Sequence, residues 1–227
     1  MLSITPSLPA KSFDEIKVLA DALDGCIPML QIDIVDGVFV PNLSWPFTEH
    51  SNVYAELENI KTLPPNVPIE LDCMVMNPEQ YIDTFVALGV RSVIVHMGST
   101  DAYEAIITHA RAHGYQIGIA ITNDSKLSEL APLIPRIDFV QVMGIAHVGK
   151  QGEPFDERTI ETLETLKKSY PDLTLVVDGA VNFETIVRLR DAGATRFAPG
   201  SVVAKSVHPL DSYKQLLDMI GLSEQVY

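Results

Sequence analysis

Two aspartates of this sequence, Asp33 and Asp178, stand where an apolar run of strand length gives way to a turn. Asp33 lies in the run 30–34, and Asp178 follows the run 173–177 and precedes a glycine. A carboxylate in such a place gains nothing from burial, so it needs another reason to be there. Two carboxylates on opposite faces of one carbon could remove a proton from one face and return it on the other. We therefore predict that they form an acid/base pair, the alternative being that each only caps a turn.

The rest of the chain alternates short apolar runs with segments of helical periodicity. The first helical segment opens at Ser12, and Glu15 three residues later predicts a capping box. Eight alternations without a Gly-, Ser- or Pro-rich linker predict an α/β fold, a single (β/α)8 TIM-barrel domain over residues 1–227. A doubly wound open sheet is the alternative, although no glycine-rich dinucleotide turn follows the first strand. The predicted strands are 2–6, 28–34, 68–75, 92–96, 116–121, 137–143, 173–177 and 196–198.

The composition argues against several classes of protein. With 47% apolar and 20% charged residues, the chain can bury a large core and is not expected to be disordered. Its net charge of −14 argues against a nucleic-acid partner or an anionic membrane surface. Two cysteines, Cys26 and Cys73, fit a reducing compartment, and neither a leader peptide nor a run of 18 apolar residues is evident. We expect a cytoplasmic protein.

In a barrel of this kind the carboxyl ends of all strands open onto one mouth, where active sites lie. Loops after the seventh and eighth strands commonly bind a phosphate through backbone N–H groups and a short helix N-terminus, which points to Gly179, Gly200 and Ser201. Lys150, in the glycine-flanked loop 149–152, would add a cation, or else is an ordinary surface lysine. The predicted strand ends also carry polar side chains and two methionines, which line the mouth or pack in the core: Ser7, Gln31, Asp72, Met74, His96 and Met143.

Five runs of the chain resemble the ribulose-phosphate 3-epimerase family. They occur in the family's order along nearly the whole chain, at residues 5–7, 33–42, 74–78, 177–179 and 200–201. The resemblance implies a phosphate-binding (β/α)8 barrel that interconverts ribulose 5-phosphate and xylulose 5-phosphate, or a close analogue, by two-base proton transfer at C3 through an enediolate. It also implies that Asp33 and Asp178 are the acid/base residues and that Ser7 contacts the substrate. Gly179, Gly200 and Ser201 would bind the phosphate.

The chain departs from the family at the metal site that the resemblance implies. The family binds a divalent metal with two histidines and the two aspartates, whereas the histidine positions here read Gln31 and Asp72. The expected ligands are thus Gln31, Asp33, Asp72 and Asp178, an all-oxygen set that suits magnesium or manganese rather than zinc. The alternative is a pocket without a metal, in which at least one carboxyl stays protonated.

Two other functions stay open on the sequence. A sugar-phosphate lyase, either a decarboxylase or an aldolase, could use the same scaffold, but it predicts a strand-end lysine that Asp72-Cys73-Met74 does not offer. A non-catalytic sugar-phosphate-binding protein is disfavoured by the two retained aspartates, but the missing histidines keep this alternative open. The expected partner is a small phosphorylated sugar, and we expect a homo-oligomer because related barrels commonly self-associate.

Overall fold

The computed structural model describes residues 1–48, 52–149 and 152–222. Its strands form one parallel sheet in the order β1-β9-β8-β7-β6-β5-β4-β3-β2. Consecutive strands therefore lie side by side, as the βα alternation of the sequence predicts. The strands are β1 (Ser3–Ile4), β2 (Ser7–Leu8), β3 (Leu30–Val35), β4 (Ile69–Met74), β5 (Ser92–His96), β6 (Gln116–Ile121), β7 (Phe139–Met143), β8 (Thr174–Asp178) and β9 (Arg196–Ala198).

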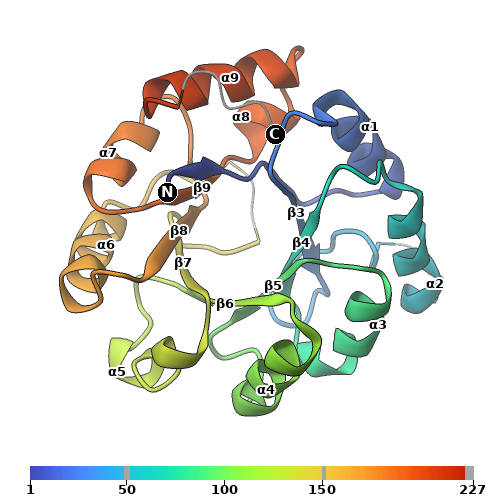
Figure 1. The fold of residues 1–227 in the computed structure, drawn as a ribbon, viewed down its shortest axis with the longest axis horizontal. Helices are drawn as coiled ribbons and strands as arrows, with labels where there is room; N and C mark the ends of the chain where they lie inside the picture. Colours follow the sequence, from blue (N-terminus) through green and yellow to red (C-terminus); the bar gives the residue numbers. More distant parts are fainter. Residues whose placement is uncertain (49–51, 150–151, 223–227) are drawn as a thin grey trace.

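The sheet closes on itself, because β1 and β2 are two halves of one strand position. β1 pairs with β9, whereas β2 pairs with β3. Thr5 between them donates its N–H to the Phe197 carbonyl at 2.8 Å, and the Pro6 carbonyl accepts from the Gln31 N–H at 2.9 Å. The ring of strands in Figure 1 is thus complete and has eight positions. The (β/α)8 barrel is confirmed and the open sheet is excluded.

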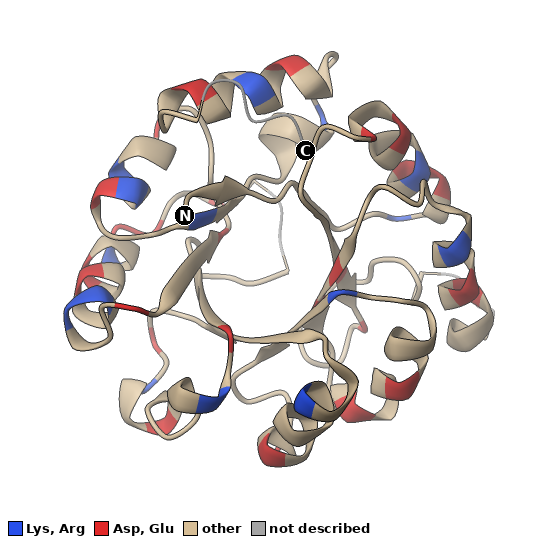
Figure 2. Ribbon diagram, viewed as in Figure 1, with Lys and Arg blue, Asp and Glu red and all other residues tan. Residues whose placement is uncertain are grey.

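Helices surround the strands (Figure 1), and Figure 2 shows most of the charged residues on these helices and the outer loops. The first helix buries Ile16, Leu19 and Leu23 against the barrel. Its predicted capping box is wrong: Ser12 makes no side-chain cap, and Glu15 accepts the N–H of Lys11 at 2.8 Å rather than that of Ser12. The helices are α1 (Phe13–Leu23), α2 (Val53–Leu57), η1 (Glu58–Thr62), η2 (Pro78–Gln80), α3 (Ile82–Ala87), α4 (Tyr103–His113), α5 (Leu127–Leu130), η3 (Ile134–Arg136), α6 (Arg158–Ser169), α7 (Ile186–Asp191), α8 (Ser201–Ala204) and α9 (Pro209–Met219).

The interior of the barrel holds both apolar and polar side chains. Its apolar part is a small cluster of Ile94, Ala120, Phe139 and Val176, which is separate from the main core between strands and helices. Two of the strands also bury a cross-barrel ion pair, in which Arg196 donates to Glu70 at 2.8 Å. No helix of the described residues combines the length and the apolar character that crossing a membrane would require.

Candidate active site

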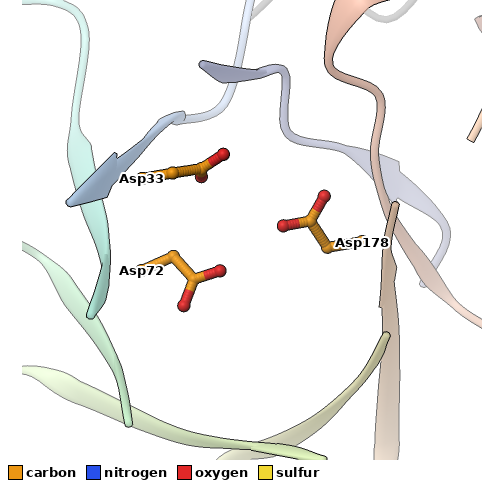
Figure 3. A group of neighbouring side chains, drawn as sticks. All are labelled: Asp33, Asp72 and Asp178. Carbon is orange, nitrogen blue, oxygen red and sulfur yellow. The ribbon is translucent and has the colours of Figure 1, made fainter. Parts of the chain in front are cut away.

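Asp33 and Asp178 face one another across the mouth of the barrel (Figure 3). Asp33 comes from β3 and Asp178 is the last residue of β8, so the closed sheet brings together residues that are far apart in sequence. Both side chains are nearly buried, with exposed fractions of 5% and 6%. Both line the same cavity of about 420 Å³. The predicted pair therefore shares one pocket of a size that suits a small ligand.

Asp72 on β4 brings a third carboxylate to this mouth. It is fully buried, and it pairs in register with Asp33 on the neighbouring strand. One oxygen from each of Asp33, Asp72 and Asp178 lies within 4.8 Å of the other two. The three acids thus form a compact group whose side chains converge in Figure 3, and all three are buried.

The amide of Gln31 bridges the two acid/base candidates. Its nitrogen donates to Asp33 Oδ1 at 2.8 Å and to Asp178 Oδ2 at 2.9 Å. The amide oxygen is buried and has no hydrogen-bond partner among the described residues. The nitrogen of Gln31, rather than the oxygen that a metal would need, therefore faces the acids in this arrangement.

Burial raises the pKa of both acid/base candidates. The pKa of Asp33 lies well above its ordinary value, because the side chain is desolvated and because Asp178 and Asp72 repel its charge. Burial and then the charge of Asp72 raise the pKa of Asp178 to about 8, although N–H groups of Gln31 and Gly179 stabilise its ionised form. Near neutral pH the pair therefore holds one proton more readily than two exposed aspartates would, so one member can act as an acid while the other acts as a base.

The loops after β8 and β9 form another part of the cavity wall. Gly179, Gly200 and Ser201 all line it, together with Ser7. Gly179 has a φ of +95°, and a Cβ there would come within 2.9 Å of Ile145, so glycine is required. Ser201 is the first residue of α8, whose first N–H groups have no partner within the helix. Met74 and Met143 also line the cavity, whereas Lys150 lies outside the described residues.

Comparison with known sequences decides the family. The sequence model of the ribulose-phosphate 3 epimerase family matches residues 3–204. A ribulose-phosphate 3-epimerase of Schizosaccharomyces pombe is 31% identical over 212 residues, which cover 91% of this chain and 88% of that protein. The chain belongs to the ribulose-phosphate 3-epimerase family. A ribulose-phosphate 3-epimerase of Oryza sativa subsp. japonica, described as the cytoplasmic isoform, is 28% identical over 212 residues, with 91% and 89% of the two chains covered.

Solved structures support the fold of this epimerase-family chain. A 3-hexulose-6-phosphate synthase superimposes with a TM-score of 0.72 at 17% identity, over 96% of this chain and 99% of the other. KGPDC from Streptococcus mutans gives a TM-score of 0.72 at 12% identity, over 96% of this chain and 97% of the other. At these identities the likeness concerns the barrel alone.

The second carboxylate of the 33–42 run has a structural role in this epimerase-family barrel. Asp36 Oδ1 accepts the N–H groups of Val38 and Phe39 at 2.8 and 2.9 Å, and its Oδ2 accepts the Met76 N–H at 2.9 Å. These bonds tie the loop after β3 to the loop after β4. Asp36 is therefore the turn-capping aspartate, and it does not line the cavity.

Several residues at the site were not predicted from the sequence. Gly144, directly after β7, packs against the backbone of Gly179: a Cβ at Gly144 would come within 2.1 Å of the Gly179 carbonyl oxygen. The Gly144 N–H also donates to the Asp178 carbonyl at 2.6 Å. The sequence does show a glycine at the end of a predicted strand, but many glycines occupy such places, so this position alone does not indicate a role for Gly144. Asn182 accepts the N–H groups of Glu184 and Thr185 through its side-chain oxygen, and it lines the cavity as well.

Proposed function

We propose that this protein is a carbohydrate-phosphate 3-epimerase, an isomerase that interconverts ribulose 5-phosphate and xylulose 5-phosphate or a close analogue. The observation that carries the proposal is the pair Asp33 and Asp178, which face each other across one cavity. Membership of the ribulose-phosphate 3-epimerase family supports the same reaction.

The chemistry asks one aspartate to be ionised and the other protonated at the start. The ionised carboxylate removes the C3 proton from one face of the sugar, and the protonated carboxyl delivers a proton to the other face. Both pKa values are raised, so a shared proton near neutral pH is compatible with this starting state. Gln31, which donates to both carboxyl groups, holds them in a fixed relation to one carbon.

The phosphate of the substrate would lie against Gly179, Gly200 and Ser201, with Ser7 as a further contact. These residues line the same cavity as the aspartates, on the loops after β8 and β9 and at the end of the first strand position. Backbone N–H groups at such loops recognise phosphate without a positively charged side chain. We keep the prediction that the positively charged side chain of Lys150 contacts the phosphate of the substrate.

A lyase on the same scaffold finds less support. Its enediolate chemistry would call for a lysine near the acids, and the described residues that line the cavity include none. A non-catalytic sugar-phosphate-binding protein would not need two facing, proton-sharing carboxyl groups. The epimerase proposal therefore accounts for more of the described site.

The proposal is tested by incubating the purified protein with ribulose 5-phosphate in D₂O. We expect xylulose 5-phosphate to form and to carry deuterium at C3, because the proton that returns comes from a solvent-exchanged carboxyl group. NMR of the sugar measures both the epimer ratio and the site of the label. Absence of both epimer formation and C3 exchange, over a range of divalent cations, would contradict the proposal.

The group of three carboxylates fits a hard divalent cation. Their oxygens lie within 4.8 Å of one another, they are buried, and oxygen ligands suit magnesium and manganese. We propose Asp33, Asp72 and Asp178 as its ligands. A half-turn of the Gln31 amide would exchange its nitrogen and oxygen, so Gln31 stays in the proposed set. A cation bound there supplies positive charge beside substrate oxygens that become more negative as the C3 proton leaves.

Removing the metal is expected to make the stability of the protein depend on pH. The pKa values of Asp33 and Asp178 are raised, so the folded state binds more protons than the unfolded state above about pH 4. Stability should therefore fall as the pH rises from 5 to 8, through the pKa of Asp178. We expect the melting temperature of chelator-treated protein to drop by several degrees over this range.

Magnesium or manganese should reverse this loss at pH 8 and restore epimerisation better than zinc does. Differential scanning fluorimetry with each cation at pH 5 and pH 8 measures the first effect, and an epimerisation assay measures the second. Asp178→Asn is the control, because the variant lacks the titrating carboxyl and should show a flatter pH profile. Restoration by zinc alone would contradict the all-oxygen ligand set.

The partner and the compartment belong to the same proposal. We propose a small phosphorylated sugar as the partner, with neither nucleic acid nor membrane, and a homo-oligomer as the state in solution. A cytoplasmic location is supported by the rice relative that is described as a cytoplasmic isoform.

A further inference from the structure

Asp72 is held from two sides, and one of the two partners is a residue that no motif points to. His96 Nε2 lies 2.8 Å from Asp72 Oδ1. The amide nitrogen of Gln141 donates to Asp72 Oδ2 at 2.9 Å. All three side chains are buried, with exposed fractions of 2% or less. Each oxygen of the third carboxylate is therefore fixed by its own partner.

The bond from Gln141 spans the interior of the barrel. Gln141 is on β7 and Asp72 is on β4, and β5 and β6 lie between these strands in the sheet. His96, Ala120 and Gln141 pair in register across β5, β6 and β7. Because the middle residue of this row is only an alanine, the two long side chains on either side of it have room to converge on Asp72.

A glutamine at position 141 destabilises the core if its side chain only fills space there. Phe139, two residues before it on β7, belongs to the apolar cluster inside the barrel. The amide oxygen of Gln141 is buried without a hydrogen-bond partner among the described residues. A buried polar atom without a partner destabilises the folded state, and a methionine of similar size would avoid this cost. The second N–H of Gln141 finds a weak acceptor in Met143 Sδ at 3.7 Å. The strong bond of Gln141 is thus the one to Asp72.

We propose that Gln141 is a positioning residue, which together with His96 orients the Asp72 carboxylate toward Asp33 and Asp178 so that the three acids can bind one divalent cation. This inference rests on the proposed function. Gln141 acts through Asp72 and does not line the cavity itself. Partners of this kind fix the direction of the remaining lone pairs of a ligand, and their loss typically weakens metal binding by about 10- to 100-fold.

The experiment compares Gln141→Met with the wild-type protein. Methionine keeps the length and volume of the side chain and removes the N–H groups. We expect the affinity for Mn²⁺, measured without substrate from the EPR signal of the free ion, to fall by about 10- to 100-fold. We expect kcat for ribulose 5-phosphate to fall while KM stays close to the wild-type value, since the phosphate-binding loops are untouched. Gln116→Met, on the exposed end of β6, is the matched control.

A merely structural role for Gln141 gives a different result. The melting temperature would fall, while the Mn²⁺ affinity of the folded protein would equal that of the wild type, and this outcome overturns the proposal. Gln141→Leu is a second apolar variant. If it changes the Mn²⁺ affinity in the same way, the effect is not specific to methionine. If wild-type protein binds Mn²⁺ but does not epimerise the sugar, the proposed function fails and the Mn²⁺ comparison still decides the role of Gln141. Wild-type protein that binds no Mn²⁺ overturns the proposal.

Discussion

Asp33→Asn and Asp178→Asn should each lower the rate of epimerisation by at least about 10³-fold, because each removes one of the two groups that carry the C3 proton. Epimerisation needs a base on one face of the sugar and an acid on the other, and the same pair acts in reverse. Both directions should therefore fail together in each variant. Turnover from ribulose 5-phosphate and from xylulose 5-phosphate, measured with coupled assays, checks this result.

Exchange of the C3 proton with D₂O separates the two roles. The remaining carboxylate in each variant reaches only one face of the carbon, so it can exchange the proton of only one epimer. We expect the two variants to differ in which epimer they label, and the double variant to label neither. If both single variants labelled both epimers at the wild-type rate, these aspartates would have no part in the proton transfer.

Stability provides the control for this pair of variants. The two carboxyl groups are buried close to a third acid, and their raised pKa values reflect an unfavourable ionised form. A neutral asparagine removes this cost, so neither variant should melt below the wild-type protein at pH 8 in the absence of a cation. A loss of activity in a protein that stays folded then reports on the chemistry.

Much of the fold could be predicted because strands and helices alternate with clear periodicities. The predicted strands 92–96, 116–121 and 196–198 agree with β5, β6 and β9 at both ends. The first strand was harder: residues 2–6 were predicted as one strand, but the chain changes partner at Thr5 and Pro6 and forms β1 and β2. A sequence pattern does not reveal this change, because pairing partners depend on the closure of the barrel.

The sequence pattern of residues 47–60 indicates one helix over the whole span, and this segment shows a second limit of such patterns. Its described part contains α2, which begins at Val53, and the 3₁₀ helix η1, which extends to Thr62. Asn52 accepts the Tyr54 N–H at 3.0 Å and caps this later start. Short helices of this kind depend on packing against the barrel more than on propensity.

The acids of the site could be predicted, but their hydrogen-bond partners could not. Carboxylates at strand ends are visible in the sequence because they interrupt apolar runs. Gln31 is expected as a metal ligand from the resemblance alone, and the sequence gives no sign that its amide nitrogen donates to Asp33 and Asp178. Gln141 lies inside a predicted strand and gave no signal, since only the closed barrel brings its side chain to Asp72.

Gly144→Ala should lower kcat by about 10²-fold, although residue 144 carries no functional group. The Cβ of alanine would come within 2.1 Å of the Gly179 carbonyl oxygen, a backbone atom that cannot turn away as a side chain could. The loop after β8 must therefore shift, and with it Asp178, whose carbonyl accepts the Gly144 N–H. A displacement of about 1 Å of a catalytic group costs on the order of 10²-fold in rate.

Gly118→Ala is the matched control for this prediction. Its Cβ would come equally close, 2.1 Å, to the Phe139 ring, which belongs to the apolar cluster inside the barrel and does not line the cavity. Overpacking of this kind costs about 1–3 kcal/mol of stability in either variant. The melting temperatures of the two variants should thus be similarly lowered, whereas kcat should fall much further in Gly144→Ala. Equal kcat values in both variants would mean that contact between the ends of β7 and β8 does not position Asp178.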